Sequence, residues 1–229
     1  MRGFFFAFLL VFWAVSAAAG PWPRDKGRHF VALGTTGQTA SLWAERGLAR
    51  GRWLALDGWV DRGSGAWLVA ATYHKALRDR GRWKLAWSAG LAVGMPDTDI
   101  TIDIPVVWFP GSWQAEITYR PTVAARLGVS LGTSLARPWP GWASLDLRLD
   151  AGPASARIKA DATLGYRLRD RWAVIGQVQL EKAKGERMQL HLAPSVVWRS
   201  GGKVSLELGL RHGLHDRRTA LKLGSWLEF

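Results

Sequence analysis

Cysteine is absent from this chain of 229 residues, so no disulfide can contribute to its stability. The chain has no His/Cys cluster with zinc spacing, phosphate loop or dinucleotide fingerprint, so we expect neither a metal nor a cofactor. Acidic residues are also scarce, with 18 Asp and Glu against 31 Lys and Arg and a net charge of +13. Beyond the N-terminal stretch, no apolar run approaches the roughly twenty residues of a spanning helix.

The N-terminus has the three parts of a secretory signal peptide. Met1 to Gly3 carries a positive charge, residues 4–15 are apolar, and Ser16 to Ala19 offers small residues for cleavage. The apolar stretch is too short for a membrane anchor. We therefore predict that residues 1–19 are a signal peptide, removed after Ala19, and that residues 20–229 form one domain.

The last eleven residues alternate in the way that a strand between lipid and a polar lumen requires. One face carries the apolar residues Leu221, Leu223, Leu227 and Phe229, with Ser225 as the one departure; the other carries Lys222, Gly224, Trp226 and Glu228. This pattern resembles the closing strand of Gram-negative outer-membrane β-barrel proteins. The resemblance implies an outer-membrane location with both termini in the periplasm, and it makes Phe229 the assembly signal. It also implies the barrel-assembly machinery and outer-membrane lipids as partners.

Alternating runs restart after basic turns about every thirty residues, which is the length of one barrel hairpin. Restarts follow Arg52-Trp53, Arg82-Trp83, Gly141-Trp142, Arg171-Trp172 and Lys203. The fold class is therefore all-β: a transmembrane, antiparallel, up-and-down β-barrel. Twelve strands are expected, at 28–36, 38–47, 51–61, 65–77, 82–94, 115–135, 141–150, 155–168, 171–183, 187–199, 203–213 and 217–229.

One segment leaves the number of strands open. Residues 95–112 also alternate, and a full hairpin there would give fourteen strands. We favour a protruding outer hairpin with its tip near Pro110-Gly111, with ten strands as a further alternative.

Tryptophans beside the turns predict an aromatic girdle at one membrane interface. Its members are Trp53, Trp83, Trp142, Trp172 and Trp198.

The same alternation predicts which charged residues face the lumen, where acids and bases are nearly balanced. The predicted network contains Asp57, Asp61, Lys84, Glu116, Arg126, Asp146, Arg148, Asp150, Arg157, Lys159, Asp161, Glu181, Arg187, Glu207, Arg211, Lys222 and Glu228. Glu45, His74 and Gln177 fall on the same face. Because unpaired charge in a confined lumen is costly, we expect ion pairs between nearby strands. Such a network either fills a structural barrel or lines a narrow pore without strong preference for ions of one sign.

Basic residues gather in the turns of one predicted rim, opposed by Asp79 and Asp170 alone. In a cytosolic chain this excess would suggest nucleic-acid binding. In an exported barrel it favours contact with anionic phospholipid headgroups or with the cell-wall polymer, so no nucleic-acid partner is expected.

Catalytic motifs are weak. Outer-membrane phospholipase and lipid A deacylase families place a Ser two residues after a His, and no His here has one. Asp97-Thr-Asp99 and His215-Asp216 resemble the catalytic groups of the omptin proteases, but the second pair has different spacing. We expect a non-enzymatic barrel, either a narrow passive channel for small polar solutes or a non-conducting scaffold that contacts the cell wall through its basic rim. An outer-membrane hydrolase or an adhesin is the minor alternative.

Overall fold

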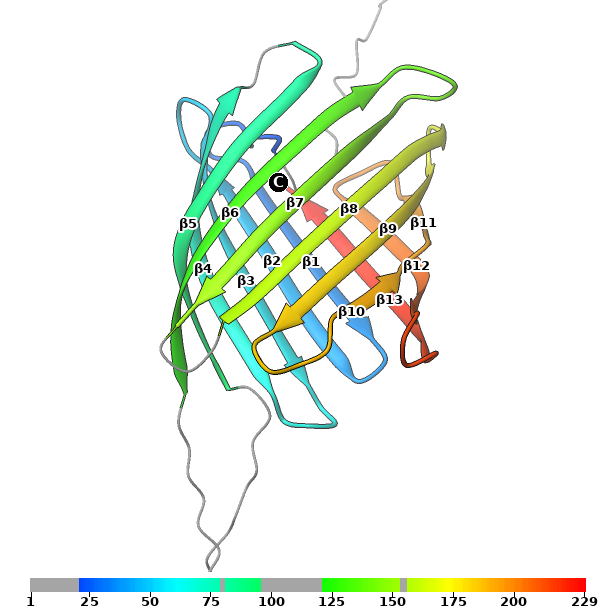
Figure 1. Cartoon of the computed structure of the whole chain (residues 1–229). Helices are drawn as coiled ribbons and strands as arrows, with labels where there is room; N and C mark the ends of the chain where they lie inside the picture. Colours follow the sequence, from blue (N-terminus) through cyan, green and yellow to red (C-terminus); the bar gives the residue numbers. More distant parts are fainter. Residues whose placement is uncertain (1–20, 79–80, 96–120, 153–155) are drawn as a thin grey trace, which may run out of the picture.

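The computed structural model describes residues 21–78, 81–95, 121–152 and 156–229, which form one closed antiparallel β-barrel (Figure 1). Consecutive strands pair around the wall, and β1 pairs with β13 to close it. At the seam, the backbone N–H of His29 donates to the carbonyl oxygen of Phe229 at 2.7 Å, and the reverse bond is 3.1 Å. Closure satisfies every strand edge, which a sheet inside a membrane requires. No helix among the described residues is long and apolar enough to span a membrane.

The strands follow the alternating runs of the sequence. Their bounds are β1 His29–Thr36, β2 Thr39–Gly47, β3 Arg52–Asp61, β4 Trp67–Arg78, β5 Trp83–Met95, β6 Thr122–Leu135, β7 Gly141–Ala151, β8 Ala156–Arg169, β9 Trp172–Ala183, β10 Gln189–Leu192, β11 Ser195–Arg199, β12 Val204–Gly213 and β13 Thr219–Glu228. Each predicted strand contains or overlaps an observed one, and most ends agree within two residues.

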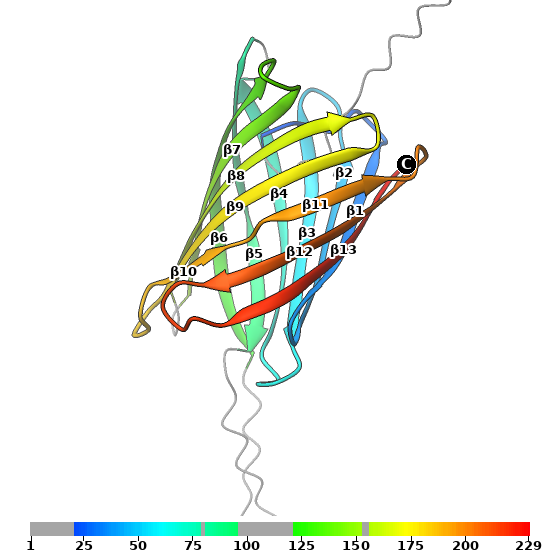
Figure 2. The same ribbon diagram turned by 90° about the vertical axis from the view of Figure 1, so that its right-hand side faces the viewer.

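Two of these segments share one place in the wall. Both β10 and β11 lie between β9 and β12, as Figure 2 shows, so the barrel has twelve strand positions. Proline has no backbone N–H, and Pro194 interrupts the strand at this point. Ala193 still exchanges two backbone hydrogen bonds with Gln177 of β9. The predicted strand 187–199 is therefore one interrupted strand.

Strand β5 pairs directly with β6, from Trp83 opposite Thr133 to Gly94 opposite Thr122. No additional wall strand fits between them, which excludes the fourteen-strand alternative and confirms twelve. Residues 96–120 lie outside the described part, and the predicted hairpin tip near Pro110-Gly111 lies there too. The predicted signal peptide, residues 1–19, also lies outside the described residues, so it stays a prediction.

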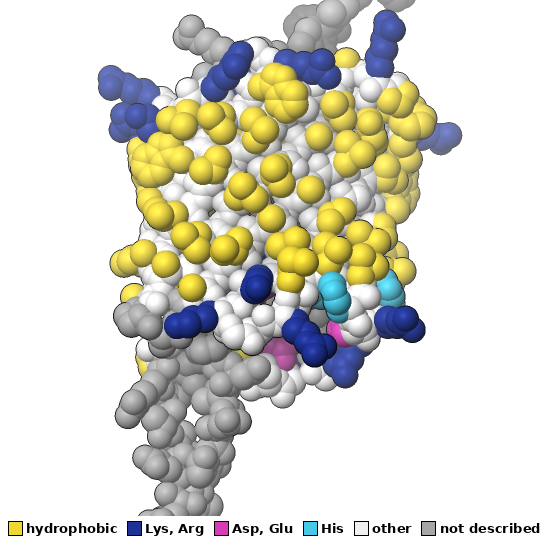
Figure 3. Space-filling model, viewed as in Figure 1, with side chains coloured by type: hydrophobic (Ala, Val, Ile, Leu, Met, Phe, Trp, Pro, Cys, Tyr) yellow, Lys and Arg dark blue, Asp and Glu magenta, His cyan; other side chains and the backbone are white. Residues whose placement is uncertain are grey.

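The turns gather at two rims, which we name by their position. The terminal rim holds Phe229, the ends of β2, β4, β6, β8 and β11 and the starts of β3, β5, β7, β9 and β12; the far rim is the opposite end of the barrel. On the face that Figure 3 shows, hydrophobic side chains spread between the two rims, and Lys and Arg border this band at both ends. An apolar band of this kind is the surface that a transmembrane barrel presents to lipid.

Candidate functional site in the barrel lumen

A buried arginine bridges the lumen between two walls. Arg126 on β6 donates from Nη1 to Asp57 on β3 at 2.6 Å, and from Nε and Nη2 to Asp150 on β7 at 2.6 and 2.8 Å. Its side chain is only 3% exposed. Buried charge is tolerable when it is paired and hydrogen-bonded on several sides, as it is here.

Small residues on the intervening strands make room for this bridge. In the wall between β3 and β6, Asp57 stands opposite Ala70, Ala70 opposite Ala92, and Ala92 opposite Ala124. The three alanines are all buried. The guanidinium of Arg126 can therefore lie over β4 and β5 and reach β3, farther than the pairing between nearby strands that we predicted.

The bridge continues along the lumen as a connected set of ion pairs. Asp57 also accepts from Arg148 at 2.8 Å. Arg157 contacts Asp150 at 3.3 Å and Glu181 at 3.1 Å. Arg148 stands directly opposite Lys159 in the sheet. This like-charge pair separates, because Arg148 turns to Asp57 while Lys159 contacts Asp161 at 3.4 Å.

A second group of polar side chains lies on strands β9 to β13. The Lys222 ammonium contacts Glu207 at 2.6 Å and donates to Oε1 of Gln177 at 3.0 Å. Glu207 also accepts a hydrogen bond from the Ser195 hydroxyl at 2.6 Å. Nearby on the far-rim side, Arg211 contacts Nδ1 of His191 at 3.2 Å. Acids and bases are thus interleaved around the whole lumen.

Residues 21–24, which we call the N-terminal segment, fold back into the lumen at the terminal rim. Pro21 is almost completely buried, and Trp22 packs against the cluster of Trp142, Ala173, Ile175 and Val197. The chain approaches β6 so closely that a Cβ at Gly132 would lie 2.6 Å from the Trp22 ring and 2.7 Å from Pro21. Only glycine fits this position without a shift of its neighbours.

Arg24 anchors the N-terminal segment. Its Nε donates to Glu45 at 2.7 Å, its Nη1 lies 3.8 Å from Glu228, and its guanidinium carbon lies 4.4 Å from the centre of the Phe30 ring. The carboxylate of Glu45 is buried, so it depends on this partner. This contact could not be predicted from the sequence, because apolar and polar residues do not alternate in residues 21–24. The signal available was a Pro-Trp-Pro run beside a lone arginine.

Two of the tryptophans that were predicted to face lipid lie inside the barrel. Trp53 is 1% exposed and stacks on His74 inside the barrel, with ring centroids 4.9 Å apart; Trp142 is buried too. Each shares its strand face with lumen carboxylates, Trp53 with Asp57 and Trp142 with Asp146. Spacing beside a turn does not decide the face of a strand, whereas alternation does. Placing Trp53 and Trp142 in a lipid-facing girdle was wrong.

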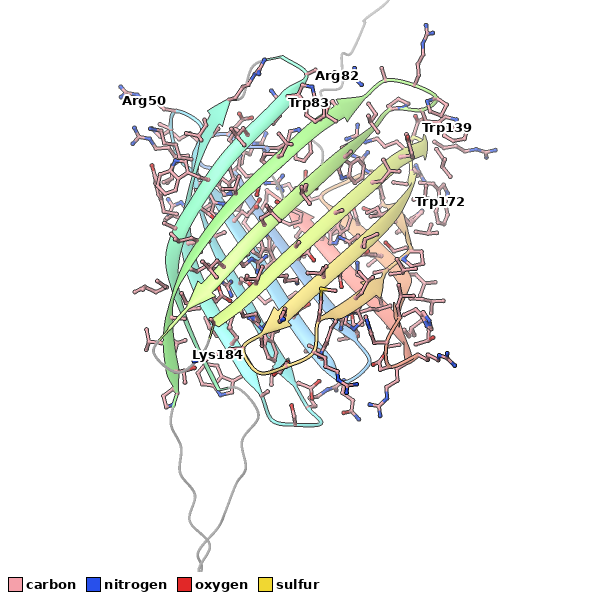
Figure 4. All side chains as sticks on the ribbon, viewed as in Figure 1. Arg50, Arg82, Trp83, Trp139, Trp172 and Lys184 are labelled. Atoms are coloured by element: carbon pink, nitrogen blue, oxygen red, sulfur yellow. The ribbon has the colours of Figure 1, made fainter. Side chains whose placement is uncertain are left out.

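The remaining girdle residues point outward. Trp83 and Trp172 are about half exposed, and Trp198 stands opposite Trp172 on the same face. Figure 4 shows Trp83 and Trp172 near the terminal rim together with Trp139, which the prediction omitted; Lys184 lies at the opposite end. The outward aromatic residues therefore border the apolar band on the terminal side, where aromatic side chains meet a membrane interface.

A cavity of about 260 Å³ lies inside the lumen below the N-terminal segment. Its wall combines aromatic residues with the charged groups described above, among them Trp43, Trp142, Arg148, Asp161 and Lys222. Among the polar atoms of that wall, Nε1 of Trp142 and Oδ1 of Asp161 are buried and have no hydrogen-bond partner in the described part of the chain. The cavity thus offers at least one free donor and one free acceptor between charged neighbours.

The remaining residues of the predicted lumen network lie partly on the lumen face and partly at the far rim. Asp61 lies at the far rim, where it accepts hydrogen bonds from the backbone N–H groups of Gly63 at 3.0 Å and Ser64 at 2.9 Å. Arg187 is exposed in the β9–β10 connection at the far rim, outside the strands. Lys84 lies on the inward face of β5, opposite Gly132. Asp146 faces inward as well and accepts from the Ser144 hydroxyl at 3.3 Å. Glu116 lies outside the described residues.

Of the groups that resemble a protease site, only His215 and Asp216 lie among the described residues. Asp216 lies in the far-rim turn 214–218, where its carboxylate accepts the backbone N–H of Arg218 at 3.1 Å. This hydrogen bond lowers the pKa of Asp216, which makes the carboxylate a turn cap and a poor general base. Asp97 and Asp99 lie outside the described residues. No group of three or more His, Asp or Glu suited to a metal occurs in the part described.

Solved structures share this architecture at very low sequence identity. The "KdgM porin" is 9% identical with a TM-score of 0.61, over 88% of this chain and 99% of the other. The structure titled "NanC porin structure in rhombohedral crystal form" is 7% identical with a TM-score of 0.53, over 87% and 98%. The fold is that of the outer-membrane porins. No protein-family model matches the chain, and no curated protein does. The structural likeness confirms the predicted β-barrel and its porin-like form.

A further structure is titled "KdgM porin in complex with disordered oligogalacturonate", with 9% identity and a TM-score of 0.59. At this identity the likeness is one of fold alone. In this chain the lumen groups that we describe carry acids and bases in alternation.

Proposed function

We propose that this protein is a narrow passive channel for small polar solutes in the outer membrane. The observation that carries the proposal is the cavity of about 260 Å³ inside a closed barrel, with unpaired donor and acceptor atoms on its wall. An apolar plug would have no need of such atoms in the lumen, whereas a solute with hydroxyl or amide groups can pair with them. The porin fold of the wall supports the same function.

The lumen charges favour neutral or zwitterionic solutes. Each base that crosses the lumen is matched by a carboxylate, as Arg126 is by Asp57 and Asp150. The potential along the path is therefore nearly balanced, and strong selection between anions and cations is not expected. The side chains of the Arg126 bridge and of the N-terminal segment lie across the lumen and narrow the path.

We further propose that the terminal rim faces the periplasm and that the far rim faces outside, by analogy with other barrels that end on a terminal aromatic. Phe229 is half exposed on the lipid side of the seam and stacks on His29, with centroids 5.3 Å apart. It is accessible to the assembly machinery from outside the barrel. The bases of the terminal rim would then meet inner-leaflet headgroups or the cell-wall polymer.

The second candidate is a non-conducting scaffold. The N-terminal segment favours it, because Trp22 and Arg24 fill the terminal end of the lumen. On this account the basic terminal rim binds the cell-wall polymer, and the lumen charges serve only to hold the barrel together.

Solute entry into liposomes separates the two candidates. Proteoliposomes placed in small neutral solutes of increasing size should swell, more slowly as the solute grows. Trp22→Ala, which removes the largest side chain of the N-terminal segment, should speed swelling. The matched control is Trp172→Ala on the lipid side, which should leave the rate unchanged. Absence of swelling with folded wild type and folded Trp22→Ala alike would favour the scaffold.

A further inference from the structure

The outer wall of strands β1–β5, which run from blue to teal in Figure 1, carries a shallow hollow. The hollow has a volume of about 560 Å³. It forms because Ala44, Ala71 and Ala89 face outward between larger neighbours. Leu56 stands between Ala44 and Ala71 in the sheet, and Tyr73 stands opposite Ala89. We call this hollow the alanine groove.

Three bases stand at the end of the groove nearer the terminal rim. Arg52 lies directly opposite Lys75, and Arg46 is the diagonal neighbour of Arg52 across β2 and β3. All three belong to the outward face, and we call them the cation cluster. Like charges directly opposite each other in a sheet repel and destabilise it, so an anion between them would be favourable.

No protein group supplies that anion in the described part of the chain. The outward faces of β1–β5 carry no Asp or Glu within the described ranges, and no described ion pair involves the cluster. The Nε of Arg52 is moreover buried without a hydrogen-bond partner. A buried N–H of a charged guanidinium is costly to leave unpaired. The cluster therefore lacks a negatively charged partner with acceptor oxygens.

The side chains between cluster and groove suit the interface of a membrane. Tyr73 and Trp87 face outward there, with ring centroids 5.9 Å apart. Amphipathic rings of this kind settle at the level of the glycerol backbone of a lipid. From rim to midwall the surface is therefore cationic, then aromatic, then apolar and grooved, in the order of the parts of a phospholipid.

We propose that this surface is a binding site for one anionic phospholipid molecule. Its phosphate lies on the cation cluster, and one acyl chain fills the alanine groove. The proposal rests on the membrane location given above and is independent of conduction. A groove alone would be filled by any lipid tail; the opposed Arg52 and Lys75 select a lipid whose headgroup carries net negative charge.

Native mass spectrometry of the detergent-solubilised barrel, titrated with phosphatidylglycerol or phosphatidylcholine, tests the proposal. We expect one phosphatidylglycerol to remain bound at collision energies that strip phosphatidylcholine. Arg46→Gln, Arg52→Gln and Lys75→Gln together should weaken phosphatidylglycerol binding roughly 100-fold, given the usual contribution of each basic residue near an anionic lipid surface. The matched control replaces the exposed terminal-rim bases Arg137, Arg169 and Arg171 by Gln. This control variant should bind phosphatidylglycerol as tightly as the wild type does.

A second pair of variants tests the groove. Ala71→Leu fills it, and Ala162→Leu adds the same bulk at an exposed lipid-facing position of β8. Only Ala71→Leu should lower the affinity for phosphatidylglycerol. Equal affinity for the two lipids, or no effect of Ala71→Leu, would overturn the proposal. Full competition by free glycerol phosphate, or a barrel dimer lost in Ala71→Leu, would also overturn it. The folded barrel is selected in every sample by its heat-modifiable gel mobility, so unfolding cannot imitate loss of binding.

Discussion

At the residue scale, the lumen is held together by charges that cannot be removed one at a time. Arg126 neutralises Asp57 and Asp150 together, while Arg148 and Arg157 each contact one of these two carboxylates from positions closer to solvent. The three arginines therefore differ in the consequence of their removal, although all three lie on the same lumen face.

We expect Arg126→Met to destabilise the barrel by about 3–5 kcal/mol, because it leaves two carboxylates without their shared buried partner. Arg148→Ala should cost much less, since Asp57 keeps Arg126 and the Arg148 side chain is 25% exposed. Unfolding in urea from lipid vesicles measures both. Adding Asp150→Asn to Arg126→Met should recover part of the loss. Equal stability of wild type and Arg126→Met would show that the bridge contributes nothing.

The corrected tryptophan faces yield a prediction of their own. Trp53→Ala should cost about 3–5 kcal/mol, because it opens a cavity beside His74 in the packed lumen wall. Trp172→Ala should cost less than half as much, since that ring is half exposed on the outer surface. The same urea measurement applies. Similar losses in the two variants would mean that the faces of β3 and β9 are misassigned.

At the element scale, the closing strand β13 connects sequence, assembly and wall. Its outward residues complete the apolar band, and its last residue forms the seam with His29. The terminal alternation alone was enough to predict this strand and which of its faces is the apolar one, because a period of two with charge on one face leaves the other face for lipid.

Phe229→Asp should prevent assembly while leaving export intact. The change places a charge on the lipid side of the seam and removes the aromatic that stacks on His29. Cell fractionation with heat-modifiable gel mobility measures the folded outer-membrane pool. Phe229→Tyr is the conservative control and should assemble. A normal pool of folded Phe229→Asp protein would contradict the role of Phe229 as the assembly signal.

At the scale of the whole molecule, the wall was predictable and its contents were only partly so. Alternation placed Asp57, Arg126 and Asp150 on the lumen face, because each strand has only two faces. Which of them pair depends on the closed wall and on Ala70 and Ala92 beneath the bridge, which no local pattern reveals. The contacts of the N-terminal segment inside the lumen were not predicted either, because they too depend on strands that meet only in the closed wall. Arg24 meets Glu45 and Glu228 only when β1, β2 and β13 stand side by side.

The most direct test of the proposed channel is single-channel current in a planar bilayer, recorded from wild type and from a variant that lacks residues 21–24. We expect small, ohmic steps with weak ion selectivity from the wild type. The deletion should give larger steps with a modest shift toward cations, since it removes Trp22 from the terminal end of the lumen and leaves Glu45 and Glu228 without the positive charge of Arg24. Absence of current from both proteins, each shown to be folded and inserted, would contradict the channel.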